Sequence, residues 1–258
     1  MRLMKRILSA AAVLALSASL LVGCSSGTAS SVPVSASSAA ESTVSSVEET
    51  ASSAVDENEA AAAQLLNYLT GSYQELWPVI LADEYKQTWL DDCTALVGAE
   101  NAEAAFEKLS SMVTGDVYGE DAVKAYANGG GAYFCGFTNS LAILTFDGET
   151  STISGTDKDG NVLFSHTYHY IGMEPVRGLY EFQSDDADSG EFTYFFLAPD
   201  TSAETYHIEF RYGSDAEALS QYDAGEYAYW VASGISTDCD QTMIDNCIEL
   251  FCTENLAG

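Results

Sequence analysis

The chain has 258 residues and is strongly acidic, with 9 Lys and Arg against 39 Asp and Glu and a formal net charge of −30. A nucleic-acid partner is excluded because binding to phosphates needs a basic face, and docking through a polybasic patch on anionic lipid is excluded for the same reason. An acidic surface can attract cations, although it also serves simply to keep secreted proteins soluble.

Residues 1–23 have the pattern of a bacterial lipoprotein signal peptide. Three basic residues within the first six precede an apolar stretch over residues 7–22, which is too short to span a membrane. The stretch ends in Leu-Val-Gly-Cys24, which resembles a lipobox, in which Cys24 receives the lipid and becomes the new N-terminus. This predicts an extracytoplasmic protein anchored to the cell membrane by lipid. A plain secretory signal is the alternative.

Residues 24–60 are predicted to be a flexible tether. They consist mainly of Ser, Ala, Thr, Val and Glu and contain no aromatic residue. Such a segment cannot bury enough apolar area to offset the entropy of ordering it. A helix over residues 48–66 is an alternative for the last part. The folded domain is therefore expected over residues 61–258, a length that suits one domain with a sizeable core.

Six cysteines are present, and five remain in the domain if Cys24 carries lipid: Cys93, Cys135, Cys239, Cys247 and Cys252. An exported location permits disulfides, and an odd number leaves at least one thiol without a partner in the monomer. Their spacing is not that of a zinc ribbon, and the pairing stays open.

Three helices are expected in the first half of the domain, over residues 76–90, 101–112 and 121–127. Apolar residues recur near a period of 3.6 in the first of them, and the Asn-Gly-Gly-Gly run at 128–131 ends the third. The glycines are not a phosphate-binding loop, because no Gly-Lys-Ser/Thr follows them.

Strand patterns then dominate the chain, with alternating Phe, Tyr, Thr and Ile and polar turns between segments. Seven strands are expected, over residues 132–137, 140–146, 151–156, 161–171, 177–183, 192–198 and 205–212. Consecutive short strands with tight turns favour an antiparallel meander, and seven or eight of them can close as an up-and-down barrel that has no exposed edge. Helices near 214–223 and 238–253 complete the chain.

Several segments resemble the ZinT/YodA family of zinc-binding domains, in the family's order and over nearly all of residues 65–258. Leu-Thr-Gly-Ser-Tyr-Gln-Glu-Leu-Trp-Pro at 69–78 resembles the opening Trp-x-Gly-x-Trp-Gln-Ser-Val-Tyr-Pro. Thr-Tyr-His-Tyr at 167–170 resembles a Thr-Tyr-x-Tyr strand, and Val-Arg-Gly-Leu-Tyr-Glu at 176–181 resembles Val-Arg-Phe-Leu-Phe-Glu. The resemblance implies a mainly β fold, a calycin-like (lipocalin-type) antiparallel up-and-down barrel flanked by N- and C-terminal helices.

The resemblance also implies a zinc site at the barrel mouth, which the family builds from three histidines. One ends a strand, and two form a His-x-His pair in the following strand. Here Asp200 takes the first position, Thr205 the second, and only His207 keeps the family's histidine. Glu209 lies on the same strand face as His207 and adds a carboxylate, a legitimate though less selective zinc ligand.

Other arrangements of these residues stay open. Arg211 shares the face of Glu209 and could pair with it, which would leave His207 as an ordinary hydrogen-bonded residue. His166 and His169, three residues apart on one strand, face opposite sides and cannot chelate one ion together, but either could approach His207 from a neighbouring strand.

The function expected from the resemblance is a lipid-anchored binding protein for divalent metal, with zinc first, that supports zinc uptake through an importer complex. The alternative is a calycin-type module that has lost the metal site and holds an apolar or peptide ligand in the barrel. An adhesive or structural surface domain is a third interpretation. The sequence shows no hydrolase or metalloprotease motif, so an enzyme is not expected.

Overall fold

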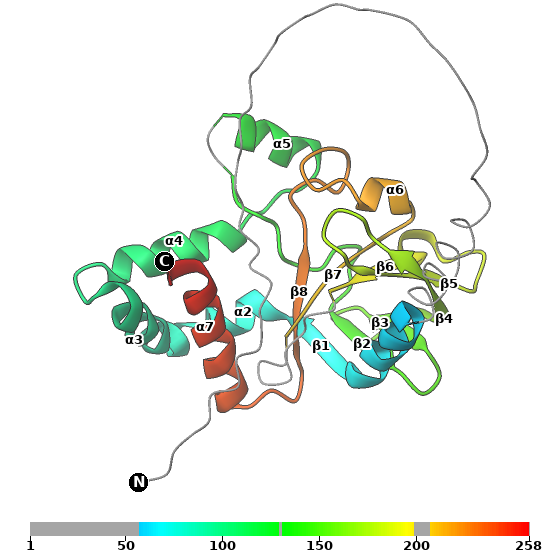
Figure 1. Cartoon of the computed structure of the whole chain (residues 1–258), viewed down its shortest axis with the longest axis horizontal. Coiled ribbons are helices and arrows are strands. Elements are labelled where there is room, and N and C mark those ends of the chain that lie inside the picture. Colours follow the sequence, from blue (N-terminus) through cyan, green and yellow to red (C-terminus); the bar gives the residue numbers. More distant parts are fainter. Residues whose placement is uncertain (1–56, 129–130, 199–206, 258) are drawn as a thin grey trace, which may run out of the picture. The chain divides into compact units, whose positions relative to one another are not determined.

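A computed structural model describes residues 57–128, 131–198 and 207–257 (Figure 1). All of them belong to one compact unit, residues 48–258. The predicted signal peptide, Cys24 and the first part of the predicted tether lie outside the described residues.

Eight strands form a closed barrel in which every neighbouring pair is antiparallel and each strand pairs with the next along the chain. The strands are β1 (Gly71–Glu75), β2 (Ile143–Asp147), β3 (Thr152–Thr156), β4 (Val162–Met173), β5 (Tyr180–Ser184), β6 (Tyr194–Leu197), β7 (His207–Gly213) and β8 (Ala232–Ser236). The barrel closes where β8 pairs with β1, with Ile235 opposite Gln74. The predicted calycin-like, antiparallel up-and-down barrel with added helices is confirmed.

Aromatic side chains fill the described interior of the barrel. Phe146, Phe182, Phe195, Phe210 and Tyr212 are at most 1% exposed and belong to one apolar cluster. An eight-stranded barrel is just wide enough for its inward side chains to fill it. This lumen is therefore a packed core, and a ligand held inside it would have to displace aromatic rings.

A helix over residues 57–68 packs against one end of the barrel. Its Ala62, Leu65 and Leu66 are buried in the barrel's apolar cluster. Gly148, in the β2–β3 turn, comes so close that an added Cβ would lie 2.3 Å from the Asn67 Cα. The helix begins at residue 57, within the last part of the predicted tether, where a helix over residues 48–66 is the alternative given above.

A second apolar core lies among the helices on the outside of the barrel. It joins α2 (Leu76–Ile80), α3 (Lys86–Val97), α4 (Ala102–Val113) and α7 (Gln241–Leu256), and we call these four the helical layer. Trp89, Leu109 and Ile248 are fully buried there. Ile235 of β8 points out of the barrel into this cluster, and so it connects the sheet to the helical layer.

Two short helices and two 3-10 turns complete the described structure. They are α5 (Glu120–Ala127), α6 (Ala216–Leu219), η1 (Asp83–Tyr85) and η2 (Gly190–Phe192). The Asp215 carboxylate caps α6 by accepting from the Glu217 and Ala218 amides. The helix predicted over 214–223 is thus only four residues long, and the chain after Leu219 turns back toward β7.

Several predicted elements differ from the structure. The helix predicted over 76–90 is divided into α2, η1 and the start of α3. The strand predicted at 132–137 contributes only isolated bridges at Phe134, to Thr114 and Trp230. Two barrel strands, β1 and β8, were not predicted. β8 has the sequence Ala-Ser-Gly-Ile-Ser and buries both of its faces, so it shows neither strong strand propensity nor polar-apolar alternation.

None of the helices in the described ranges has both the length and the apolar character that crossing a bilayer requires.

Candidate metal site and a neighbouring pocket

Strand β7 places His207 and Glu209 together on the outside of the barrel. Ile208, Phe210 and Tyr212 point into the barrel core, so the alternate residues point outward, as the period-2 pattern predicted. His207 is half-buried and lies opposite Ile235, while Glu209 is exposed and lies opposite Ser233. A nitrogen donor and a carboxylate thus share one face where β7 begins.

The remaining positions of the family's site lie in the connection between β6 and β7. Asp200 and Thr205 both fall in residues 199–206, outside the described residues. The donor types that the sequence offers near β7, one imidazole and two carboxylates, suit zinc chemically. Within the described ranges, no group of three or more His, Cys, Asp and Glu side chains is arranged to hold a metal ion.

Arg211 is the third outward residue of β7. The sequence left open a pairing of Arg211 with Glu209, but its partners in the structure are different. Its side chain is fully buried, and the guanidinium donates to the backbone carbonyls of Leu219, Gln221 and Tyr227. It also lies 4.4 Å from the ring centre of Tyr222. Burial lowers the pKa of Arg211, with Tyr222 acting in the opposite direction. The arginine therefore anchors the segment after α6 to the barrel wall.

A buried carboxylate balances this arginine from the β4–β5 turn. Glu174 is 1% exposed and accepts from the backbone amides of Val176 and Arg177, each at 2.7 Å. Tyr222 donates to the same carboxylate at 3.3 Å, and the Arg177 guanidinium also lies over that ring, 4.1 Å from its centre. The Val-Arg motif at 176–177 thus belongs to a structural cluster.

The two histidines of β4 face opposite sides of the strand, as predicted. His166 is turned toward Phe164 and Tyr168 and pairs through Nδ1 with Asp186, whereas His169 is exposed and pairs through Nδ1 with Asp185. Both distances are 2.6 Å. In the barrel order β5 and β6 separate β4 from β7, so neither histidine is on a strand next to His207.

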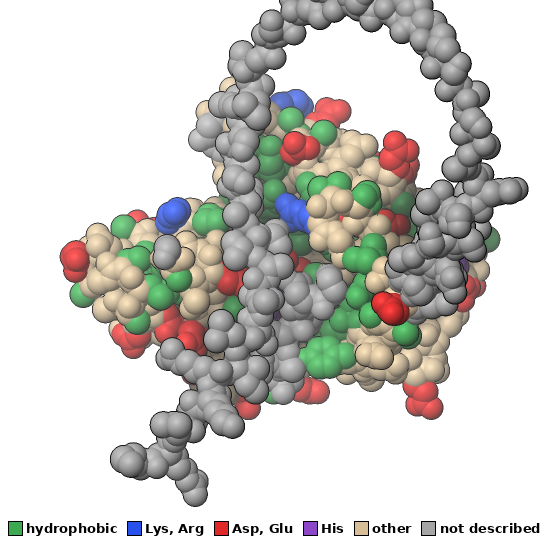
Figure 2. Space-filling view, viewed as in Figure 1, with side chains coloured by type: hydrophobic (Ala, Val, Ile, Leu, Met, Phe, Trp, Pro, Cys, Tyr) green, Lys and Arg blue, Asp and Glu red, His purple; other side chains and the backbone are tan. Residues whose placement is uncertain are grey.

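Acidic side chains do not by themselves mark a cation site. In Figure 2 the Asp and Glu side chains of the visible face stand at several separated points, with a few basic side chains between them. A spread of this kind fits the general role of charge in solubility.

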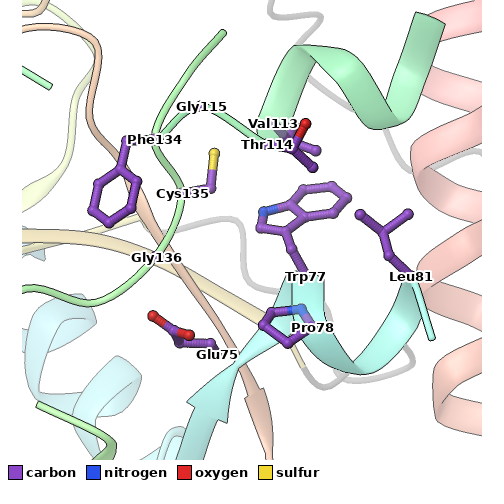
Figure 3. A pocket seen from close by; sticks show the side chains of 10 residues that line it. All are labelled: Glu75, Trp77, Pro78, Leu81, Val113, Thr114, Gly115, Phe134, Cys135 and Gly136. Carbon is purple, nitrogen blue, oxygen red and sulfur yellow. The ribbon is translucent and has the colours of Figure 1, made fainter. Parts of the chain in front are cut away.

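A pocket of about 340 Å³ lies between the helical layer and the barrel (Figure 3). Its lining is mostly apolar and consists of Glu75, Trp77, Pro78, Leu81, Val113, Thr114, Gly115, Phe134, Cys135 and Gly136. The Trp77 indole projects between Leu81 and Cys135 in the figure. Its buried Nε1 has the Cys135 sulfur as its hydrogen-bond partner, and no nitrogen or oxygen accepts from it among the described residues.

Two further groups give the pocket its chemical character. Burial, followed by the Glu209 carboxylate, raises the pKa of the Cys135 thiol to about 12, so this cysteine stays protonated and apolar. The Glu75 carboxylate accepts from the Phe137 amide at 2.6 Å and stands at the rim. Sequence reasoning missed this site because its lining comes from three separate segments, residues 75–81, 113–115 and 134–136. The only available signal was the Gln-Glu-Leu-Trp-Pro run at 74–78.

The described residues define a calycin-like, closed up-and-down barrel carrying a layer of helices. No protein-family model matches the chain, and no curated protein matches it. Among solved structures, it is similar to the Zn(II)-bound ZinT-like domain of AdcA from Streptococcus pneumoniae, with a TM-score of 0.45 and 15% identity over 71% of this chain and 89% of that one. It is also similar to Zn(II)-bound AdcA from the same organism, with a TM-score of 0.43 and 13% identity over 72% of this chain, and it spans 35% of that longer chain.

Proposed function

We propose that this chain is a lipid-anchored, extracytoplasmic binding protein for divalent metal, most of all zinc, and that the metal is bound where β7 begins. In this proposal the protein is not an enzyme, and it supports zinc uptake as a binding partner of an importer. The observation that carries the proposal is the shared outward face of His207 and Glu209 beside the connection that contains Asp200 and Thr205. The ordered sequence motifs that resemble the ZinT/YodA family support it.

In this proposal zinc is carried and passed on, so the ligands should allow the ion to be released as well as bound. A neutral imidazole from His207 supplies one nitrogen, and Asp200 and Glu209 supply carboxylate oxygens. Oxygen ligands select zinc less sharply than imidazole or thiolate, so cobalt and manganese should compete more effectively than at a three-histidine site. Protonation of His207 would release the ion, since only the neutral ring is a ligand.

The test is calorimetric zinc titration of the metal-stripped full chain with its thiols blocked. The wild type is compared with His207→Ala and with His169→Ala, a matched exposed histidine on another strand. We expect one equivalent of zinc at micromolar affinity or better, at least a tenfold loss in the first variant and less than a twofold change in the second. Equal affinity in all three proteins would refute the assignment of His207.

The anchor is tested separately by metabolic labelling with a fatty acid in a bacterial host. The wild-type chain should incorporate the label and fractionate with membranes, whereas Cys24→Ser should do neither. A labelled variant, or an unlabelled wild type, would contradict lipid attachment at Cys24.

A second candidate function, binding of an apolar ligand, is favoured by the pocket beside Trp77. Its volume of about 340 Å³ lies in the range of small-molecule sites, and its lining is mostly apolar. The site lies outside the barrel, because aromatic rings occupy the lumen.

This candidate is tested with a neutral solvatochromic dye. Val113→Phe should fill the pocket and abolish dye binding, while Met112→Phe, at the neighbouring position outside the lining, should leave it intact. Dye binding that survives Val113→Phe would remove the pocket from consideration.

A further inference from the structure

Two cysteines face each other in the middle of the helical layer. The Cys93 sulfur on α3 lies 3.9 Å from the Cys252 sulfur on α7, and both side chains are fully buried. The two positions are 159 residues apart in sequence. The helices that carry them pack directly against each other, near the fully buried Trp89 and Ile248.

The surroundings of this pair keep it from acting as a metal site or as a reactive nucleophile in the folded protein. Burial is the main cause that raises the pKa of Cys93, and burial together with the neighbouring Cys93 thiol raises that of Cys252. The nearest charged group that acts on both is the Asp92 carboxylate, which raises both pKa values further. A thiolate is needed for either metal binding or attack on a disulfide, and here it is disfavoured.

We propose that Cys93 and Cys252 are a disulfide-forming pair that ties the C-terminal helix α7 to α3. The reaction is exchange with a disulfide-bearing oxidant, either a dithiol oxidoreductase or oxidised glutathione. The Cys93–Cys252 bond forms while the oxidant's sulfur–sulfur bond breaks. The two cysteines lose two electrons and two protons, and the oxidant leaves as two thiols.

The geometry requires only a local adjustment. The sulfurs must approach from 3.9 Å to the bonded distance of about 2.05 Å, a change that two facing side chains share by small rotations. Because both thiols are shielded in the packed domain, the attack takes place while α7 is still undocked. The finished bond is then enclosed by apolar side chains, so reductants reach it slowly until the helix opens.

The other three domain cysteines are placed differently. Cys135 lines the pocket beside Trp77, Cys247 is buried on α7, and Cys239 is partly exposed just before that helix. The Cys239 thiol acts electrostatically on Cys247, which makes these two the main competing pair. One bond between Cys93 and Cys252 leaves three thiols, in agreement with the odd number in the domain.

The experiment uses the full chain, refolded with a mixture of oxidised and reduced glutathione and then alkylated with N-ethylmaleimide in denaturant. Peptide mass spectrometry without reduction should find a cross-linked species containing Cys93 and Cys252, with Cys135, Cys239 and Cys247 alkylated. Alkylation at all five positions, or a cross-link that joins Cys239 to Cys247 instead, would overturn the proposal. This readout on the wild type does not depend on whether variants fold.

Thermal unfolding gives the second readout. Cys93→Ala, Cys252→Ala and the double variant should each melt roughly 5–15 °C below the oxidised wild type, with no additional loss in the double variant. Cys239→Ala is the matched control and should melt like the wild type. A reductant should lower the melting temperature of the wild type and leave that of the Cys93→Ala variant unchanged. If the decreases in melting temperature of the two single variants add up in the double variant and the reductant has no effect, a bond between the two residues is contradicted.

Discussion

The barrel and the helical layer are stabilised by different means. The barrel is closed on itself by eight strand pairings and filled with aromatic rings, and the segment after its seventh strand is anchored by the buried Arg211. The helical layer has short helices, a five-residue α2 among them, and its core includes four cysteines. A change in charge or ring packing should therefore act mainly on the barrel, and a change in redox conditions mainly on the layer.

The largest expected effect comes from removing the charge of Arg211. Arg211→Met removes the donor to the carbonyls of Leu219 and Tyr227 and one of the two cations in the cluster around the buried Glu174. Breaking a buried charge cluster on one side costs about 3–5 kcal/mol. Urea titration measures this cost as the difference in the free energy of unfolding between the variant and the wild type. Arg177→Met, which removes the second cation over the Tyr222 ring, is the control and should cost about 1 kcal/mol. Equal losses would show that Arg211 has no special role.

Two isoleucines allow the stability of the barrel and of the helical layer to be tested separately. Ile235 points into the helical layer and Ile208 into the barrel, and both are at most 1% exposed. Either change to Ala should cost about 2–4 kcal/mol. Hydrogen exchange should show faster opening of α3 and α7 in Ile235→Ala, and of the barrel strands in Ile208→Ala. The same pattern in both variants would mean that the regions open as one unit.

A smaller effect is expected at Asp92 on α3. Its Oδ2 is buried without a hydrogen bond, and burial, followed by Glu249 and Asp245, raises its pKa. Since the folded-state pKa lies above the unfolded one, ionised Asp92 destabilises the fold at neutral pH, and this cost disappears as the pH falls through the folded-state pKa. Asp92→Asn should raise the melting temperature by about 1–3 °C at pH 7 and by nothing at pH 3. Glu107→Gln, an exposed position on α4 that does not act on Asp92, is the control. A gain that is independent of pH would contradict the electrostatic cause.

The smallest effect concerns thiol reactivity. Cys239 is partly exposed and should react first with iodoacetamide at pH 8, whereas Cys135, with a pKa of about 12, should react roughly 100-fold more slowly. The rate at Cys135 should rise about tenfold per pH unit, because the thiolate fraction rises by that factor below the pKa. Peptide mass spectrometry over time measures both rates, and similar rates at the two residues would refute the burial of Cys135.

The sequence predicted the hairpins that carry strong local patterns. β4, β5 and β7 carry aromatic residues at alternate positions between polar turns, and such patterns need no knowledge of distant partners. β1 and β8 escaped prediction because their signal lies in pairing with each other across the whole domain, with Tyr73 opposite Ser236. Closure of the barrel was therefore inferred from strand count and from family resemblance.

Part of the candidate site could likewise be predicted from local sequence, and part of it could not. The period of β7 correctly placed His207 and Glu209 on one face and Ile208 and Phe210 on the other. The partners of Arg211 could not be predicted, because they are backbone carbonyls of a segment that folds back after α6. The proximity of Cys93 to Cys252 likewise depends on how two helices dock. The metal assignment stays a prediction.

The most direct test of the proposed metal site is zinc-edge X-ray absorption of the full chain loaded with one equivalent of zinc, with the thiols left unblocked. We expect nitrogen and oxygen ligands at about 2.0–2.1 Å, with an imidazole signature that disappears in His207→Ala. A shell of sulfur ligands at about 2.3 Å, or an unchanged spectrum in the variant, would place zinc on the cysteines or on another residue set and contradict the account.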